Sequence, residues 1–142
     1  MASTILAQVF QYDRNKTREW PVPSGTLEGT AVLSASNQPG VTLTPRGDAT
    51  RTKSLAGMPY VITYPAAPIG VRTDSAIVAV DGSWLGPIVG ATTGTPRNTL
   101  VYIDVTGALT LTSTSNTKFG VTDSYSGKGT ASATVVKVGV FA

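Results

Sequence analysis

The chain lacks the residue types on which most catalysis near neutral pH depends. It contains no histidine and no cysteine, so it can form neither a Ser-His-Asp triad nor an imidazole or thiolate metal site. Its eight acidic residues are scattered singly along the sequence. A hydrolase that uses two of these carboxylates is the enzymatic alternative that stays open. We otherwise expect no catalytic residue, no cofactor and no metal site.

One short motif superficially resembles a phosphate-binding loop. It is Gly127-Lys128-Gly129-Thr130, but position 122 is threonine where the motif requires a glycine, and no helical pattern follows. We interpret residues 125–129 as a turn.

The basic residues do not form a nucleic-acid-binding pattern. Eleven Lys and Arg give a net charge of +3, but they are spread over the whole chain. The densest group, Arg14, Lys16 and Arg18, is flanked by Asp13 and Glu19. Nucleic-acid binders usually concentrate cations among stacking aromatic residues. We therefore predict no direct contact with nucleic acid.

Composition indicates a single all-β domain. Charged residues make up 13% of the chain, which also contains 15 glycines and 9 prolines, a balance typical of short strands joined by turns. A chain of 142 residues buries about 68% of its unfolded surface, so one core can form without disulfides. No apolar run is long enough to cross a membrane. The N-terminus lacks the basic start of a secretory signal, so we expect synthesis in a cytoplasm.

The segment Leu100–Val121 predicts a hairpin together with its register. Apolar residues alternate with polar ones on both sides of a break, the pattern of half-buried strands. A three-residue loop at 105–107 would pair Ile103 with Leu109 and Val101 with Leu111, which places all four side chains on one face.

The loop chemistry supports that register. Asp104 stands at the first position of a type I turn and Gly107 at the last, where the hairpin needs a left-handed residue. A two-residue loop would instead set Asp104 opposite Leu109, so we reject it.

Other strands are predicted from β-branched runs bounded by turn residues. The dipeptide Asp81-Gly82 predicts a tight hairpin that places Trp84 opposite Ala79. Neither face of the last segment is wholly polar, which indicates a strand buried on both sides. The predicted strands are Thr26–Ala35, Val41–Thr44, Tyr60–Tyr64, Ala76–Val80, Ser83–Val89, Lys118–Ser124 and Thr130–Phe141.

The C-terminal half resembles a known family. The string VYID at 101–104, a glycine turn, LTLT at 109–112, then Asn116 and Phe119-Gly120-Val121 are similar to the small head decoration (capsid cement) proteins of tailed bacteriophages, over roughly 75–142. The resemblance implies a compact antiparallel β-barrel or sandwich, β-tulip-like, with no catalytic motif. It also implies a homotrimer on the outer surface of the virion that clamps neighbouring subunits of the major capsid protein, with no membrane partner.

We divide the chain into an N-terminal arm, residues 1–25, and a β-rich decoration domain, residues 26–142. The prolines around Trp20 exclude a helix there; the earlier apolar residues fit a helical face or an extended arm, and we favour the extended form. Exposed apolar residues of this kind usually mark a partner interface, here by strand addition to a capsid protein. The alternative is that Phe10 and Trp20 pack on the body. The candidate contacts are Ile5, Leu6, Val9, Phe10, Tyr12, Arg14, Arg18 and Trp20.

A second candidate interface lies in the body. The stretch Arg46–Pro59 is weakly periodic and predicts a surface loop or insertion that carries Arg46, Arg51 and Lys53. The alternative is an ordinary solvated loop.

Two functions therefore remain open. The first is a capsid cement protein. The second is a carbohydrate- or receptor-binding β module, for which aromatic rings could supply stacking surfaces. Those rings are Trp20, Tyr60, Tyr64, Trp84 and Tyr125.

Overall fold

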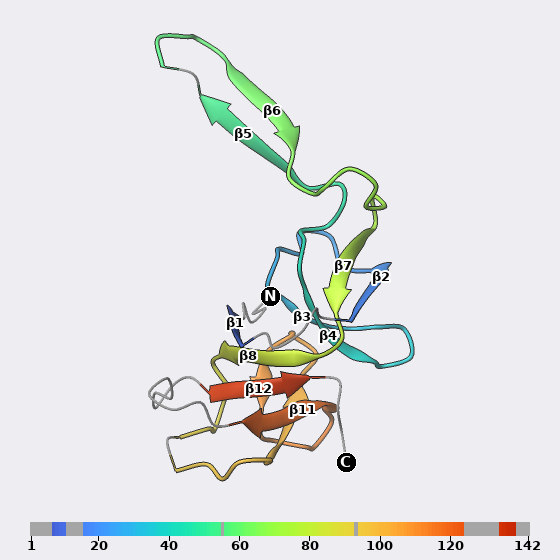
Figure 1. Cartoon of the computed structure of the whole chain (residues 1–142), viewed down its shortest axis with the longest axis vertical. Coiled ribbons are helices and arrows are strands. Elements are labelled where there is room, and N and C mark those ends of the chain that lie inside the picture. Colours follow the sequence, from blue (N-terminus) through green and yellow to red (C-terminus); the bar gives the residue numbers. More distant parts are fainter. Residues whose placement is uncertain (1–6, 11–15, 55, 93, 124–133, 139–142) are drawn as a thin grey trace.

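The protein is built from antiparallel β-sheets. The computed structural model describes residues 7–10, 16–54, 56–92, 94–123 and 134–138, and every regular element within these ranges is a strand. The prediction of an all-β protein is confirmed. The described strands form a six-stranded, a four-stranded and a two-stranded sheet, and none of these three sheets closes into a barrel (Figure 1).

The six-stranded sheet contains the first and last described strands. Strand β12 occupies a central position between β8 and β11, with Val136 opposite both Trp84 and Thr122. The expected strand Lys118–Ser124 corresponds to β11. In spatial order the strands are β1 (Ala7–Phe10), β8 (Gly82–Gly86), β12 (Thr134–Val138), β11 (Thr117–Asp123), β9 (Leu100–Ile103) and β10 (Leu109–Thr110).

The predicted β9–β10 hairpin is confirmed at its turn. Ile103 lies opposite Leu109, and the N–H of Gly107 donates to the carbonyl of Asp104 at 3.1 Å, with a φ of 87° at Gly107. The ladder ends at Thr110, so the expected pair of Val101 with Leu111 does not form. The N–H of Leu111 donates instead to the carbonyl of Val89, at 3.1 Å.

The four-stranded sheet has the spatial order β2 (Thr17–Pro21), β7 (Ser75–Ala79), β4 (Pro39–Thr42) and β3 (Ala31–Leu33). The predicted strand Thr26–Ala35 is therefore too long. Its first half is irregular because Gly29 has a φ of 77° and because the hydroxyl of Thr30 donates to the carbonyl of Leu27 at 2.7 Å. Turn hydrogen bonds of this kind compete with a ladder.

The predicted hairpin around Asp81-Gly82 is wrong. Strand β7 has β2 and β4 on its two edges, which leaves no edge for β8. A type I′ turn needs positive φ at both central residues, and of these two residues Gly82 alone has it, at 111°. The chain therefore crosses from one sheet to the other at this point. Trp84 lies opposite Gln8 and Val136, and not opposite Ala79.

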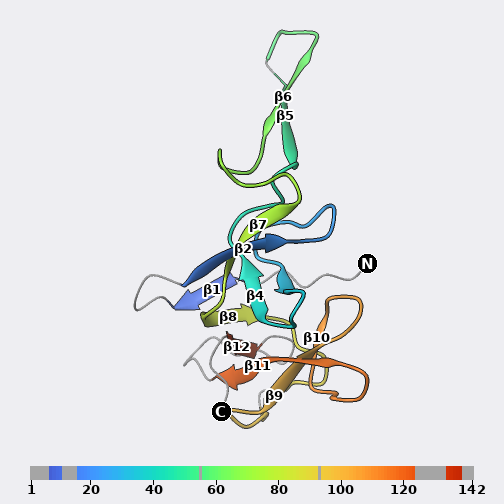
Figure 2. The same ribbon diagram turned by 90° about the vertical axis from the view of Figure 1, so that its right-hand side faces the viewer.

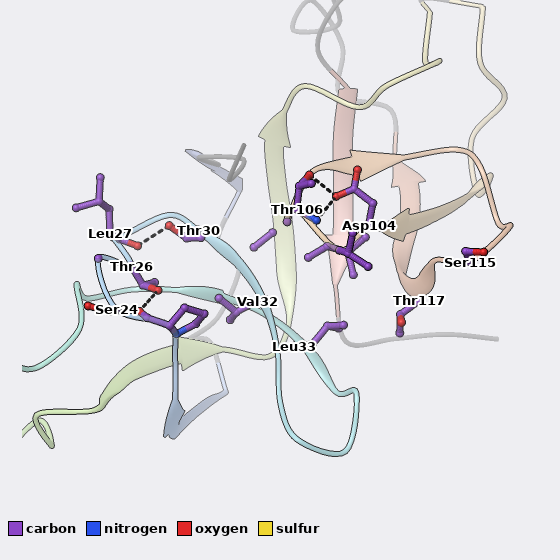
Figure 3. A pocket seen from close by; sticks show the side chains of 16 residues that line it. Ser24, Thr26, Leu27, Thr30, Val32, Leu33, Asp104, Thr106, Ser115 and Thr117 are labelled. Atoms are coloured by element: carbon purple, nitrogen blue, oxygen red, sulfur yellow. Dashed lines mark hydrogen bonds between the residues drawn. The ribbon is translucent and has the colours of Figure 1, made fainter. Parts of the chain in front are cut away.

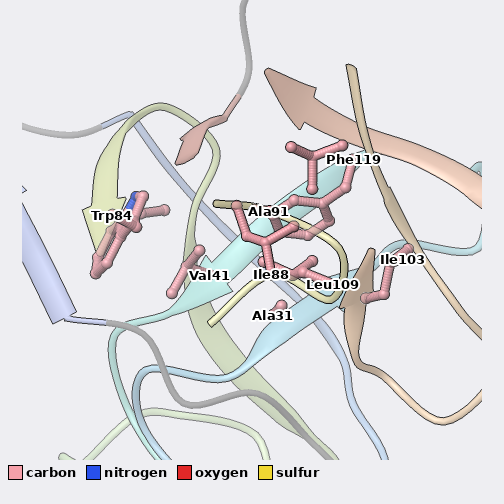
Figure 4. Close-up of a cluster of buried hydrophobic side chains, with 10 residues drawn as sticks. Ala31, Val41, Trp84, Ile88, Ala91, Ile103, Leu109 and Phe119 are labelled. Atoms are coloured by element: carbon pink, nitrogen blue, oxygen red, sulfur yellow. The ribbon is translucent and has the colours of Figure 1, made fainter. Parts of the chain in front are cut away.

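The larger core cluster joins the two main sheets. Val41 and Ala79 of the four-stranded sheet pack with Val101, Leu109 and Phe119 of the six-stranded sheet, and all five are fully buried (Figure 4). A second cluster, within the four-stranded sheet and its flanks, contains Trp20, Val22, Val32, Ala76, Val78 and Val80.

A two-stranded ribbon projects from this body. Strands β5 (Thr50–Ser54) and β6 (Val61–Pro65) pair only with each other and extend away from the other sheets (Figures 1 and 2). The expected strand Tyr60–Tyr64 corresponds to β6. The expected loop Arg46–Pro59 is corrected, because it contains β5. The sequence of β5, TRTKS, is polar on both faces, so it carries no hydrophobic alternation that would reveal a strand.

Candidate functional site

The projecting ribbon, residues 50–65, exposes unusually many apolar side chains. All ten residues of β5 and β6 are exposed. An isolated two-stranded ribbon is at best marginally stable in water, and contiguous exposed apolar groups usually mark an interaction surface. The large apolar residues of the ribbon that are between 41% and 55% exposed are Met58, Tyr60, Val61, Ile62 and Tyr64.

The register separates the ribbon into two chemically different faces. Arg51 lies opposite Tyr64, and Lys53 lies opposite Ile62. Since directly opposed residues share a face, these four residues form one surface, which we call the basic–aromatic face. The alternate residues form the other surface, which we call the threonine face: Thr50, Thr52, Ser54, Val61, Thr63 and Pro65.

The base of the ribbon is hydrogen-bonded to the body. The N–H of Gly47 donates to the carbonyl of Ser75 at 2.8 Å, and the N–H of Asp48 donates to the carbonyl of Thr73 at 3.0 Å. A third hydrogen bond, 2.9 Å from the N–H of Ala66 to the carbonyl of Ala49, closes the two chains just below the strands. The ribbon is thus held at its base and free along its length.

The three expected contacts of this region differ in their surroundings. Arg46 lies at the base and donates to the carboxylate of Asp48 at 2.6 Å. Arg51 is 3.7 Å from the carboxylate of Glu28, and both side chains are more than half exposed, so this ion pair adds little stability. Lys53 has no ion pair with any residue that the structure describes. The ribbon therefore presents cations that a partner can engage.

A groove of about 740 Å³ lies on the body between residues 23–33 and the β9–β10 turn (Figure 3). Two of its hydroxyls are engaged in local turns: that of Thr26 donates to the carbonyl of Pro23 at 2.6 Å, and that of Thr30 donates to the carbonyl of Leu27 at 2.7 Å. No aromatic residue is among the described residues that line it. The groove therefore offers no ring on which a sugar could stack.

The carboxylate of Asp104, at one end of this groove, is a structural acceptor. It receives hydrogen bonds from the hydroxyl and the N–H of Thr106, at 2.6 and 2.8 Å, and from the N–H of Ala108 at 3.0 Å. These donors, the Thr106 hydroxyl first, hold the pKa of Asp104 below its ordinary value. Asp104 is thus kept ionised, and its Oδ1, which accepts all three hydrogen bonds, serves the turn.

The eight contact residues predicted in the N-terminal arm do not form one exposed surface among the described residues. Trp20 is buried in β2, which agrees with the alternative that this residue packs on the body. Strand β2 pairs with β7 along its length. Arg18 is exposed on the same strand, with its guanidinium donating to the carbonyl of Thr17. Val9 and Phe10 belong to β1, an extended strand. Four residues lie outside the described ranges: Ile5, Leu6, Tyr12 and Arg14.

The structure also limits the set of rings available for stacking. Trp20 and Trp84 are buried, whereas Tyr60 and Tyr64 are exposed on the ribbon; Tyr125 lies outside the described residues. Sequence reasoning assigned the two tyrosines only to sugar binding and missed Ile62 altogether. The alternation of Tyr60, Ile62 and Tyr64 in the sequence places these side chains on one side of a strand. The sequence did not show that β5 pairs with this strand and adds Arg51 and Lys53 to the same face.

Within the part of the chain that the structure describes, acidic side chains do not gather into a group of three that could hold a metal ion, and no helix qualifies as a membrane span.

Comparison with known proteins found no matching family model, no matching curated protein and no matching solved structure.

Proposed function

We propose that the protein is a capsid decoration protein that binds the outer surface of a tailed-phage head and stabilises contacts between major capsid subunits. The observation that carries the proposal is the β5–β6 ribbon, an exposed element with apolar side chains that is rooted in a packed body. The resemblance of residues 101–121 to decoration proteins supports the same function. The residues of that resemblance supply buried core positions, among them Val101, Leu109 and Phe119.

The proposed mechanism is binding without chemistry. A protein that binds only the assembled lattice stabilises that lattice in proportion to its affinity and its occupancy. A homotrimer would carry three ribbons, and simultaneous contacts would raise the effective affinity through local concentration. Because the ribbon is hydrogen-bonded to the body at its base, the freedom of that base is already lost before binding, which favours affinity.

The direct test is reconstitution on heads of the virus that encodes the chain, stripped of this protein. We expect saturable binding with a copy number fixed by the lattice symmetry, and a higher temperature of head disruption at saturation. A density map of the reconstituted head should place the ribbon against the major capsid protein. Failure of the folded protein to bind such heads would overturn the proposal.

A carbohydrate- or receptor-binding module is the second candidate, and the exposed Tyr60 and Tyr64 are the observation that favours it. Retention of the isolated protein on a glycan array, with loss of retention in Tyr60→Ala or Tyr64→Ala, would support this function. A glycan array without bound protein, together with saturable head binding, would select the decoration function.

A further inference from the structure

We propose that the ribbon docks through one face only, the basic–aromatic face of Arg51, Lys53, Ile62 and Tyr64, onto an acidic and partly apolar patch of a partner protein. The inference rests on the proposed function, in which that patch belongs to the major capsid protein. It adds which side of the ribbon becomes buried and which chemistry the partner must offer.

The two faces differ in what they can contribute to binding. Ile62 and Tyr64 are 43% and 41% exposed, so each still has a large area to bury. Tyrosine and arginine are enriched among the residues that dominate protein interfaces, whereas threonine and serine contribute less. The aliphatic stems of Arg51 and Lys53 widen the apolar surface around their cross-strand partners. The threonine face has one large exposed apolar side chain, Val61, but neither a cation nor an aromatic ring.

The positive charge of the ribbon indicates that the partner surface is acidic. Between Ala49 and Pro65 the chain contains two cations, Arg51 and Lys53, and no acidic residue. Lys53 has no ion pair with a described residue, and Arg51 has only the exposed 3.7 Å contact with Glu28. A partner carboxylate could accept two parallel hydrogen bonds from the guanidinium, which is stronger and more specific than that contact.

A second copy of this chain is a poor partner for the basic–aromatic face. Two such faces in contact would bring like charges together. Five of the carboxylates whose side chains the structure describes are also engaged within their own chain. Ion pairs join Glu19 to Arg72 and Asp48 to Arg46, and hydrogen bonds engage Asp74, Asp81 and Asp104. Glu28 has only the exposed 3.7 Å contact with Arg51.

Nucleic acid is also disfavoured as the occupant. Its affinity comes mainly from neutralising many phosphates, and the ribbon offers two cations beside a larger apolar surface. The ribbon is better matched to a protein interface, which has an apolar centre and a polar rim.

The test compares two double variants that change the net charge equally but on opposite faces of the same strand. Arg51→Ser/Lys53→Ser removes two positive charges from the basic–aromatic face. Thr50→Glu/Thr52→Glu adds two negative charges to the threonine face. Each variant lowers the net charge from +3 to +1, so a difference between them reports on the face. The probe is the stripped head used above, with the full-length chain and circular dichroism as the check on folding.

We expect Arg51→Ser/Lys53→Ser to raise the Kd for heads by at least about tenfold, and Thr50→Glu/Thr52→Glu to change it by less than about threefold. Binding of the wild-type chain should weaken with added salt. A second matched pair tests the apolar part: Tyr64→Ala should weaken binding by about tenfold, whereas Thr63→Ala should leave it near the wild-type value.

Equal effects of both double variants, or normal binding by Arg51→Ser/Lys53→Ser, would overturn the face assignment while the proposed function stands. No binding of the wild-type chain to heads would overturn both. Retention of a duplex DNA probe by the wild-type chain, lost in Arg51→Ser/Lys53→Ser, would assign the face to nucleic acid and overturn the inference.

Discussion

At the scale of single residues, several polar side chains in the described part of the chain build turns. Asp104 accepts hydrogen bonds from Thr106 and Ala108, and the hydroxyls of Thr26, Thr30 and Thr99 donate to carbonyls three residues earlier. Side chains used in this way fix the chain direction at strand ends. Threonine abundance therefore serves turn geometry as well as strands.

Replacement of Asp104 by Asn should make the protein's stability less dependent on pH. The pKa of Asp104 is lowered in the folded state by the Thr106 hydroxyl and backbone donors. A carboxyl group whose pKa is lowered on folding stabilises the folded state at pH values above its unfolded-state pKa. This contribution is lost as the pH falls through the folded-state pKa. The wild type should therefore exceed Asp104→Asn in urea midpoint at neutral pH, and the difference should shrink below about pH 4.

Thr106→Val provides the companion variant, because it removes the largest cause of the shift while the carboxylate remains. The pKa of Asp104, followed by NMR titration, should rise toward its ordinary value. A difference between wild type and Asp104→Asn that is constant from acid to neutral pH would contradict this explanation.

Gly47 is required where the ribbon joins the body. A Cβ at this position would overlap the carbonyl oxygen of Arg72 and lie 2.9 Å from that of Val71. Backbone atoms cannot move aside as a flexible side chain can, so we expect Gly47→Ala to lower the free energy of unfolding by about 1–3 kcal/mol. Gly94→Ala is the control, since its Cβ would meet only Thr92 Oγ1 at 3.7 Å. Equal urea midpoints for the two variants would contradict the close approach.

At the scale of elements, the ribbon is attached to the fold but supports little of it. All ten of its strand residues are exposed, whereas neither buried core cluster includes a ribbon residue. Its removal therefore subtracts surface and leaves the packing of the body intact.

Excision of residues 50–65, with Asn-Gly joining Ala49 to Ala66, should leave a folded body. The hydrogen bond between these two alanines already brings the chains together, and Asn-Gly favours a two-residue hairpin turn. We expect the free energy of unfolding to change by less than about 1 kcal/mol, as for other surface changes, and head binding to be lost. A large fall in melting temperature would show that the ribbon supports the core.

Elements with their own periodicity were predictable from the sequence, and elements defined by a distant partner were not. The β9–β10 turn followed from Asp104 and Gly107 because all its determinants are local. The assignment of β7 and β8 to different sheets could not be predicted locally, because it depends on β2 and β4 occupying the edges of β7. The ribbon was half predicted: β6 has apolar alternation, whereas polar β5 is a strand only because β6 pairs with it.

At the scale of the whole molecule, the larger core cluster draws residues from both main sheets, so the sheets should unfold together. Trp20 belongs to the smaller cluster and Trp84 to the larger. Trp20→Phe leaves Trp84 as the reporter of the six-stranded sheet, and Trp84→Phe leaves Trp20 for the four-stranded sheet.

In each single-tryptophan variant, the urea transition followed by fluorescence should coincide with that followed by far-ultraviolet circular dichroism. The variants themselves will differ in stability, so the comparison is made within each protein. Fluorescence and dichroism midpoints that separate in either variant would mean that the two sheets unfold independently.

The position of β8 between β1 and β12 also constrains the order of events during synthesis. Its two neighbours come from opposite ends of the described chain, so the sheet can be completed only after Val138 has been synthesised and has left the ribosome. Until then β8 keeps an unsatisfied edge, and pairing across such long sequence separations is intrinsically slow. Incompletely paired strands expose nascent copies to strand exchange with one another, so we expect the yield of folded protein to depend on translation speed and chaperone access.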